Sequence, residues 1–374
     1  MPKTAYFDNG ATTKVDERVV KKMEGVFLRN YGNASSMHMV GQDAKSLLED
    51  ARKIIKKKLN AKKVIFTSGG SESDNLAIKG VAYSKKRGHI ITSKIEHPAV
   101  LRTCESLEKE GFEVSYLDVD KEGFVNPEDV KKEIKKNTIL VSIMFANNEI
   151  GTIQDIEKIG KICKENRVLF HTDAVQAFTK ENIDMKNMNI DLLSLSGHKI
   201  HGPKGIGVLA FGSDVELKRL IDGGGQEYKL RAGTENVPGA VGFAEAVKLI
   251  KDDDVKRMKK LRNKIIDNVL KEIPDSKLNG PREKRLANNV HFSFKDVEGE
   301  ALGGYLYGKG LCTSTGSACA TLSMEPSHVL VALGLEKEFS NGSVRITLSK
   351  FTTEEEVDYL LKELPHIVKK LRRF

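Results

Sequence analysis

The sequence predicts an α/β protein with a mostly parallel sheet and a second, smaller domain. Short apolar runs rich in β-branched residues alternate with amphipathic stretches rich in Lys and Glu over roughly residues 15–250. Strands that are apolar throughout and separated by helices are typical of parallel sheets covered on both faces. A chain of 374 residues also has the length for two domains.

The predicted strands of the large domain are separated by segments with helical periodicity, such as "ESDNLAIKGVAYSKKR". These strands span residues 63–68, 89–94, 113–119, 138–145, 168–173, 191–197 and 205–211, which predicts a seven-stranded sheet. Ligands of open α/β sheets bind outside the carboxyl ends of the strands. We therefore expect the polar clusters "TSGGSES", "EH", "NNE", "TDAVQ" and "SGHK" at those ends to share one pocket.

The pattern changes after "GGGQEYKLRAGTENVPGA". A long charged helical segment near 252–273 precedes the apolar runs "NNVHFSF" and "SVRITLS" and a last amphipathic segment. This order predicts a smaller α+β domain that also takes in the extreme N-terminus. The expected boundaries are 15–250 for the large domain, and 1–14 together with 251–374 for the small domain.

Composition excludes several classes of protein. The net charge of +9 comes from lysines that are scattered over predicted helices, so we expect solvated helix faces and no direct binding of nucleic acid. No apolar run approaches the roughly 18–20 residues that span a bilayer, and no secretory segment is recognisable, so we expect no membrane association. Cys104, Cys163, Cys312 and Cys319 form no CxxC pair or zinc-like spacing. We expect no metal site and a cytoplasmic location with free thiols.

Two of the strand-end clusters suit a bound anion and a protonated ring nitrogen. In "VIFTSGGSESDNLAI", Gly70 and Ser71 open a predicted helix, whose N-terminal N–H groups favour an anion; an ordinary helix cap is the alternative. In "LFHTDAVQA", Asp173 ends a strand, with Gln176 three residues later. A buried carboxylate there can hold a protonated pyridine nitrogen, as an electron-sink cofactor such as pyridoxal 5'-phosphate (PLP) requires. A helix-capping Asp is the alternative.

Two further clusters carry bases. In "LSLSGHKIHGPKGIG", Lys199 follows a strand end and is flanked by Ser196 and His198, and a desolvated lysine there can form a Schiff base. His97 in "SKIEHPAV" can stack on a cofactor ring or move protons, or it can be a structural histidine.

The order of these motifs resembles one family over nearly the whole chain. The matching motifs are "YFDNGATT", "YGNASSMH", "FTSGGSESDNLAIKG", "EHPAV", "ANNEIGTIQ", "HTDAVQ", "SGHKIHGPKGIG", "GGGQE", "RAGTENV", "STGSACA", "EPSHVL" and "VRITLSKFTTEEEVDYL". The chain resembles the NifS/IscS-like cysteine desulfurases, PLP enzymes of the class V aminotransferase superfamily, whose members have the type I fold of PLP-dependent transferases.

The resemblance implies a role for each matching residue. Lys199 would bind PLP and move the Cα proton of L-cysteine, and Cys319 would take the sulfur as a persulfide and release L-alanine. Asp173 would pair with the pyridine nitrogen and His97 would stack on the ring. The other implied contacts are Asn148 and Gln176 near the ring hydroxyl, Gly70, Ser71, Ser196, His198 and Thr234 at the phosphate, and Asn33 and Arg345 at the substrate carboxylate.

The resemblance also implies partners. Thr234 would reach in from a second subunit, which makes a homodimer the expected state. The sulfur would pass to an iron–sulfur scaffold or to another acceptor, such as a tRNA-thiolation enzyme. A selenocysteine lyase or an aminotransferase of the same superfamily is an alternative, as is a non-catalytic, RNA-associated sulfur carrier.

Overall fold

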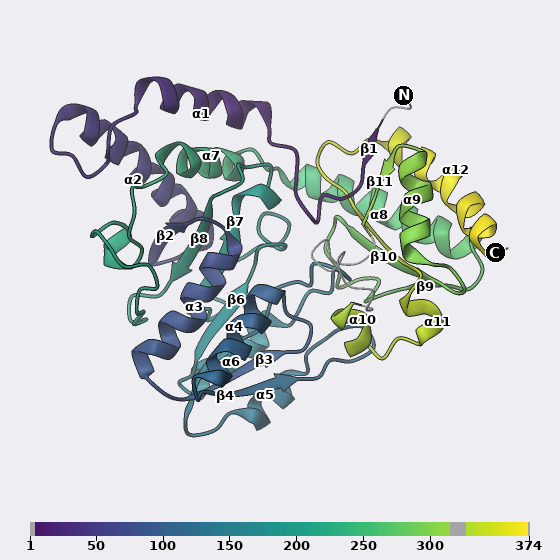
Figure 1. The fold of residues 1–374 in the computed structure, drawn as a ribbon, viewed down its shortest axis with the longest axis horizontal. Coiled ribbons are helices and arrows are strands. Elements are labelled where there is room, and N and C mark those ends of the chain that lie inside the picture. Colours follow the sequence, from purple (N-terminus) through teal and green to yellow (C-terminus); the bar gives the residue numbers. More distant parts are fainter. Residues whose placement is uncertain (1–3, 315–326, 373–374) are drawn as a thin grey trace.

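The computed structural model describes residues 4–314 and 327–372 (Figure 1). Its centre is a seven-stranded sheet with the strand order β2-β8-β7-β6-β5-β3-β4. The strands are β2 (Lys63–Thr67), β3 (His89–Ser93), β4 (Glu113–Leu117), β5 (Thr138–Ser142), β6 (Leu169–Asp173), β7 (Leu192–Ser196) and β8 (Gly207–Phe211). All seven predicted strands are confirmed, and β8 is the strand of this sheet that runs antiparallel to its neighbours.

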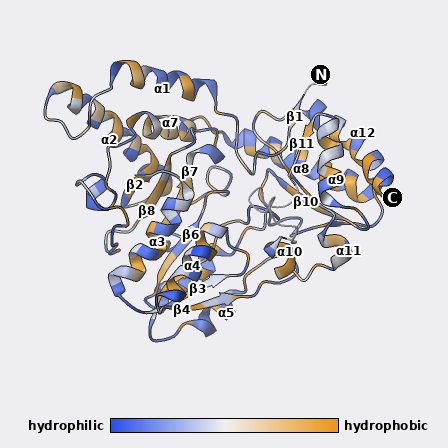
Figure 2. Cartoon of the chain, viewed as in Figure 1, coloured by the Kyte–Doolittle hydropathy of each residue, from blue (hydrophilic) through white to orange (hydrophobic). Residues whose placement is uncertain are grey.

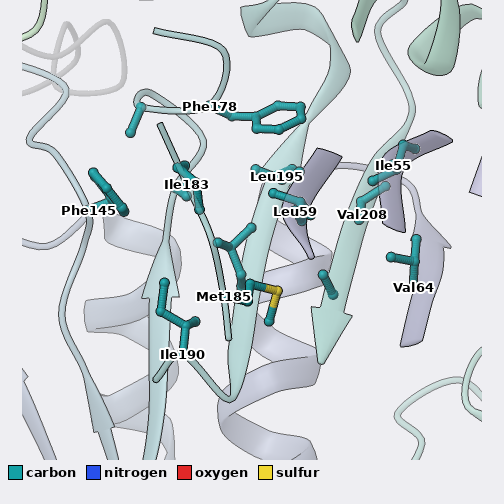
Figure 3. Close-up of a cluster of buried hydrophobic side chains, with 14 of the residues drawn as sticks. Ile55, Leu59, Val64, Phe145, Phe178, Ile183, Met185, Ile190, Leu195 and Val208 are labelled. Atoms are coloured by element: carbon teal, nitrogen blue, oxygen red, sulfur yellow. The ribbon is translucent and has the colours of Figure 1, made fainter. Parts of the chain in front are cut away.

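Helices cover both faces of this sheet. Neighbouring strand residues point to opposite faces, as in β7, where Leu193 packs into one buried cluster and Leu192 into another. The larger cluster also takes in side chains from α1 (Glu17–Arg29), α2 (Met39–Leu59), α5 (Pro127–Glu133), α6 (Ile156–Glu165) and α7 (Val237–Lys248), and Figure 3 shows part of it. The second cluster takes in side chains from α3 (Gly70–Lys85) and α4 (Pro98–Lys109). The predicted α/β fold class is therefore confirmed.

A separate apolar core lies in the C-terminal part of the chain. It gathers side chains from α8 (Asp252–Glu272), β10 (Asn289–Phe294), α9 (Gly299–Gly308), β12 (Ser343–Thr347) and α12 (Glu354–Leu371), together with Ala5 and Phe7. The strands β12, β10 and β9 (Ser276–Leu278) form a sheet of their own, and the apolar sides of the helices face it (Figure 2). The separation of the cores supports the two-domain boundaries given above, which stay a prediction.

Short elements complete the C-terminal part. The short helices α10 (His328–Ala332) and α11 (Lys337–Ser340) precede β12. Side chains of α10 pack against Ile95, Met144 and Ile150, which follow strands of the large sheet. α10 therefore joins the C-terminal part of the chain to the large sheet.

The N-terminal segment connects the two cores. Its strand β1 (Ala5–Tyr6) pairs in parallel with β11 (Leu311–Cys312). A few residues later, the N–H and hydroxyl groups of Thr13 donate to the carbonyl of His198 at 3.0 and 2.8 Å. The segment therefore crosses the end of the large sheet. None of the helices in the described ranges combines the length and apolar character that crossing a bilayer requires.

Candidate active site

A cavity of about 260 Å³ opens at the carboxyl ends of the central strands. Most of the residues predicted for a site line it together: Gly70, Ser71, His97, Asn148, Asp173, Gln176, Ser196, His198, Lys199 and Arg345. They come from loops that follow β2, β3, β5, β6 and β7 and from β12. The expectation that one pocket unites these strand ends is met by the geometry.

The first turn of α3 presents backbone N–H groups to the cavity. Gly69 caps this helix without any side-chain hydrogen bond, so Ser71 does not act as its cap. A Cβ atom added to Gly70 would come within 2.9 Å of Val175 Cγ2, which shows how closely the backbone approaches the loop after β6. Glu72 accepts a hydrogen bond from the N–H of Ser68 at 2.8 Å. The helix end thus retains free donors and partial positive charge for an anion.

Two buried carboxyl groups face the cavity. Asp173 ends β6 and accepts a hydrogen bond from Val175 N at 2.9 Å through Oδ1. Burial raises the pKa of Asp173, and the charges of His97 and Lys199 act in the opposite direction. Asp74 lies on α3, where burial and then the charge of Asp173 raise its pKa well above the ordinary value. Each carboxyl group is therefore harder to ionise than a solvated one, and at Asp74 the charge of Asp173 adds to the effect of burial.

His97 combines a structural role with a place in the cavity wall. Its Nδ1 accepts a hydrogen bond from Ala99 N at 3.1 Å and so caps α4, which begins with Pro98. Burial lowers the pKa of His97, although the charge of Asp173 opposes this. The ring is therefore neutral near pH 7 and fixed in orientation, as a surface for a flat ligand requires.

Lys199 lies in a short 3₁₀ turn (Gly197–Lys199) directly after β7. Its Nζ donates to the carbonyl oxygens of Gly10 at 2.5 Å and Ala11 at 2.8 Å. Gln176 Nε2 donates to the same Gly10 carbonyl at 3.0 Å. His198 Nδ1 lies 3.1 Å from Thr12 Oγ1, and burial together with the charge of Lys199 lowers the pKa of His198 to about 4. The N-terminal segment thus positions the lysine and its neighbours.

Arg345 brings a cation from β12 into the cavity. Its guanidinium donates from Nη2 to Asp8 Oδ1 at 3.0 Å and from Nη1 to the carbonyl of Asn148 at 3.1 Å. The buried Nε has no hydrogen-bond partner within residues 4–314 and 327–372. A buried donor without a partner carries a desolvation cost, so this arginine is suited to binding an acidic group.

Comparison with known proteins decides the family. The model of the class-V aminotransferases matches residues 5–360. The chain is 50% identical to the cysteine desulfurase IscS of Clostridium botulinum, with 100% of this chain and 96% of that protein covered. It is 51% identical to the cysteine desulfurase IscS of Methanosarcina thermophila, with 99% and 93% covered. The chain belongs to the class-V aminotransferase family. Within it, the chain is a member of the cysteine desulfurase family, as the sequence motifs predicted.

A solved structure has the same fold. A NifS-like protein superposes with a TM-score of 0.92 at 40% identity, and the match covers 99% of this chain and 100% of that one. Both the fold class and the PLP dependence expected from the sequence follow from this membership.

The cavity of this class-V aminotransferase family member fits PLP. The first turn of α3 offers N–H groups to a phosphate, Asp173 offers a carboxylate to a pyridine nitrogen, and Lys199 offers an amine. The close approach at Gly70 leaves no room for a side chain between the helix end and the loop after β6. These features together form the donor and acceptor set that a phosphorylated pyridine ligand needs.

Three predicted residues are not among those that line the cavity. Asn33 is exposed, and its Oδ1 accepts a hydrogen bond from Ser35 N at 2.8 Å. Thr234 is also exposed. Cys319 lies outside the described residues, so its predicted role is untested. The buried thiols of Cys104 and Cys163 have pKa values raised to about 12 by burial, which suits inert packing residues.

Sequence reasoning missed other residues of this site. Asp74 lines the cavity although it is not among the site residues predicted from the sequence. The spacing could have predicted this position, because residues i and i+4 of a helix share one face and Asp74 follows Gly70 by four residues. Gly10, Ala11 and Asp8 act through long-range contacts, for which no local sequence signal exists.

Proposed function

We propose that this enzyme removes sulfur from L-cysteine, releases L-alanine and holds the sulfur as a persulfide on Cys319. The observation that carries the proposal is that a lysine, a buried carboxylate and a cationic carboxylate-binding side chain line one cavity, in a chain about 50% identical to cysteine desulfurases. An aminotransferase would share these three groups, but it would need no thiol. Cys319 is therefore the residue that separates the two activities.

The residues of the cavity divide into two groups in this proposal. Those that hold PLP are Gly70, Ser71, His97, Asn148, Asp173, Gln176, Ser196, His198 and Lys199 of one chain and Thr234 of a second. PLP supplies an electron sink that lowers the cost of removing the Cα proton of the substrate. Asp173 is the carboxyl group proposed to pair with a protonated ring nitrogen, because it lines the cavity at the end of β6 and the N–H of Val175 fixes its Oδ1.

The substrate is bound and oriented by Arg345. The carboxylate of L-cysteine would accept hydrogen bonds from Nε and Nη2 of the guanidinium, and it would replace Asp8 at Nη2. Asn33 is proposed to assist at the same carboxylate. This clamp places the substrate Cα within reach of Lys199, which lines the same cavity.

Protons and sulfur then move between named atoms. The Nζ of Lys199 takes the Cα proton and returns a proton to the carbon skeleton. The thiolate of Cys319 attacks the substrate Sγ, so that a new S–S bond forms while the C–S bond breaks. The electron pair of the C–S bond goes to the carbon that becomes the methyl group of alanine, and a proton completes that group. No external oxidant or reductant is needed for this half of the cycle.

A homodimer is part of the proposal. The end of α1, the loop after it and the first residue of α2 carry large exposed apolar side chains, namely Phe27, Leu28, Tyr31, Met37 and Met39, and Met37 is 94% exposed. Several exposed apolar side chains within one short segment are a reason to propose an interface there. Asn33 lies in the same segment, and a second copy would let Asn33 and Thr234 serve a cavity that they do not line in the single chain. Sedimentation velocity tests this state.

The sulfur acceptor and the location complete the proposal. We expect an iron–sulfur scaffold or another protein, such as a tRNA-thiolation enzyme, to take the persulfide sulfur. A cytoplasmic location agrees with the three described cysteines, which are all free.

Two variants test the function. With L-cysteine and a thiol reductant, we expect Cys319→Ala to lose sulfide release, because no thiolate remains to take the sulfur. We expect Lys199→Ala to lose alanine formation as well. Alanine and sulfide are quantified separately. Full sulfide release by Cys319→Ala would show that the persulfide role of Cys319 is wrong. Pyruvate formation that is insensitive to thiol alkylation would favour an aminotransferase instead.

A further inference from the structure

A second, smaller hollow adjoins Lys199. It has a volume of about 20 Å³, and Lys199 is the residue that lines both this hollow and the main cavity. Its wall also includes Lys180, Asn288 and Lys350. The buried Oδ1 of Asn288 has no hydrogen-bond partner in the described part of the chain. The hollow is large enough for about one water molecule, so the amine of Lys199 has a polar neighbourhood outside the main cavity.

Lys180 is held in a fixed position at this hollow. Its Nζ donates to the carbonyl of Gln176 at 2.9 Å, one helical turn back along the loop after β6. The preceding residue, Thr179, has a φ of 70°, which is a rare and strained backbone conformation for a β-branched side chain. Backbone strain of this kind persists only where the surroundings enforce it, and such sites are frequently functional. The turn thus directs a lysine towards the neighbourhood of Lys199 at an energetic cost.

Lys350 and Lys180, which also line this hollow, differ in whether a carboxylate neutralises their charge. Lys350 donates to Asp16 at 2.6 Å, and both side chains are buried, so its positive charge is neutralised locally. Lys180 forms no ion pair within 4 Å in residues 4–314 and 327–372. Burial and the charge of Lys199 lower the pKa of Lys180 to about 8, so it remains mostly cationic at neutral pH. A lysine without an ion pair in the described residues therefore lines the same hollow as Lys199.

Other titratable groups face these two lysines as well. They are Asp16, His97, Asp173, Glu181, His198, His201, Asp254, Arg345 and Lys350. The histidines are neutral near pH 7 because burial lowers the pKa values of His97, His198 and His201. The carboxylates favour a protonated Lys199, and Lys180 is the neighbour that acts against them without a bound counter-ion.

We propose that Lys180 is a positioning residue whose positive charge favours the neutral, proton-accepting form of Lys199. This inference rests on the proposed role of Lys199. A free lysine amine is protonated at neutral pH and cannot accept a proton from Cα. A neighbouring cation in a desolvated site favours the neutral amine, because two like charges there repel. The same repulsion makes Lys199 return the proton readily after it has taken it.

The test measures the protonation of Lys199 directly in the full-length chain freed of PLP. Trace labelling of amines by acetic anhydride at a series of pH values, followed by mass spectrometry of the peptide that holds Lys199, gives the pH midpoint of its reactivity. We expect Lys180→Met to raise this midpoint by about one pH unit, or about tenfold in the fraction of neutral amine. Lys180→Arg keeps the charge and should leave the midpoint within about 0.3 units.

Two controls make the result decisive. Lys186→Met removes an exposed lysine outside both hollows and should not move the midpoint. Lys180→Gln is a second neutral variant, and near-UV circular dichroism of each variant checks that it is folded. If both neutral variants fold and keep the wild-type midpoint, the inference is wrong.

The holoenzyme supplies a second readout. In the pH profile of kcat, which reports the complex in which L-cysteine has displaced the Lys199 amine, the acidic limb of Lys180→Met should move up by about one unit, while Lys180→Arg should follow the wild type. Failure of the proposed function is distinguishable, because it would appear as normal alanine formation by Lys199→Ala. If Lys199 is essential and neither the labelling midpoint nor the acidic limb moves, only the inference about Lys180 fails.

Discussion

Two buried arginines, at opposite parts of the molecule, show how a structural ion pair differs from a ligand site. Arg52 on α2 makes two hydrogen bonds to Glu227, at 2.7 and 3.0 Å, and a third to the carbonyl of Val64. Its guanidinium also lies between the rings of Phe66 and Tyr228, at about 5 Å from each centroid. Arg345 lines the main cavity and has one carboxylate contact, one carbonyl contact and an Nε without a partner in the described residues.

The difference lies in how completely each charge is satisfied. Burial opposes the charged form of Arg52, but the hydrogen bonds to Glu227 outweigh it and raise its pKa further. Glu227 also accepts from Phe66 N at 2.9 Å on the edge strand β2, so no polar capacity is left over for a ligand. Arg345 retains one donor, its Nε, without a hydrogen-bond partner in the described residues. A buried cation is therefore a candidate binding group when part of its fork lacks a protein partner, and burial or charge alone does not distinguish the two cases.

The largest expected effect comes from breaking the satisfied pair. Arg52→Met leaves Glu227 buried without its cation and should lower the free energy of unfolding by about 3–5 kcal/mol. The midpoint of urea denaturation measures this loss. The double variant Arg52→Met with Glu227→Gln removes both charges and should recover most of it. A loss below about 1 kcal/mol for the single variant would show that the pair is not effectively buried.

The next largest expected effect is a loss of catalytic efficiency on substitution of Arg345 in the cavity. Arg345→Lys keeps the charge but loses the fork, so we expect kcat/KM for L-cysteine to fall by about 30- to 100-fold, mainly through a higher KM, which corresponds to about 2–3 kcal/mol. The PLP absorbance should persist. Asp8→Asn is the matched control, since it weakens the internal competitor of the substrate and leaves the fork intact. An unchanged KM in Arg345→Lys would remove Arg345 from substrate binding.

The surroundings of Arg345 should also respond to pH. His291 is opposite Arg345 in the β10–β12 pairing, and burial together with the charges of Arg345 and Arg285 lowers its pKa to about 3. Its folded pKa lies below the unfolded value of about 6.5, so its contribution to stability is present above pH 6.5 and is lost as pH falls towards 3. Each pH unit inside this window costs about 1.4 kcal/mol for this residue.

Urea denaturation at pH 7.5 and pH 5.5 measures this term. The wild type should lose stability on acidification, and His291→Gln should lose about 1 kcal/mol less between the two pH values. Other buried histidines with lowered pKa values, such as His171, add to the loss in both proteins and cancel in the comparison. An identical loss in wild type and His291→Gln would mean that His291 is hydrated in the folded state.

The smallest expected effect tests the aromatic side of the Arg52 site. Tyr228→Ala removes one of the two rings beside the guanidinium and should cost about 1 kcal/mol in unfolding free energy, measured by urea denaturation. The hydrogen bonds to Glu227 remain, so the cost should be well below that of Arg52→Met. Tyr307→Ala, which removes an exposed ring on α9, is the control for loss of surface apolar area. Equal costs for the two alanine variants would remove the stacking contribution.

The sequence predicted the large sheet because its signals are local. The strands β2 to β8 are short runs rich in apolar and β-branched residues, and each observed strand lies inside its predicted range. The direction of β8 was not predicted, since a buried antiparallel strand has the same apolar pattern as a parallel one. The cavity residues were found because they follow strand ends and because their motifs resemble those of a known family.

Contacts between distant parts of the chain could not be predicted. Asp8 and Arg345 are 337 residues apart, and Arg52 and Glu227 are 175 apart, so neither charge pair has a spacing that sequence reasoning can use. The position of Lys180 depends on the left-handed turn at Thr179, and a threonine gives no signal for such a turn. These features arise from tertiary packing, whereas strands and helix ends arise from neighbouring residues.

The N-terminal segment has a consequence for the order of events during synthesis. Residues 8–13 hold Arg345 through Asp8, Lys199 through the carbonyls of Gly10 and Ala11, and His198 through Thr13. The N–H of Gly10 further donates to Thr347 Oγ1 at 2.7 Å. Asp8 and Gly10 therefore obtain their partners on β12 only after more than 300 further residues have been synthesised. A nascent chain that already contains the large sheet still lacks the finished cavity, so assembly of the site is a late step of folding.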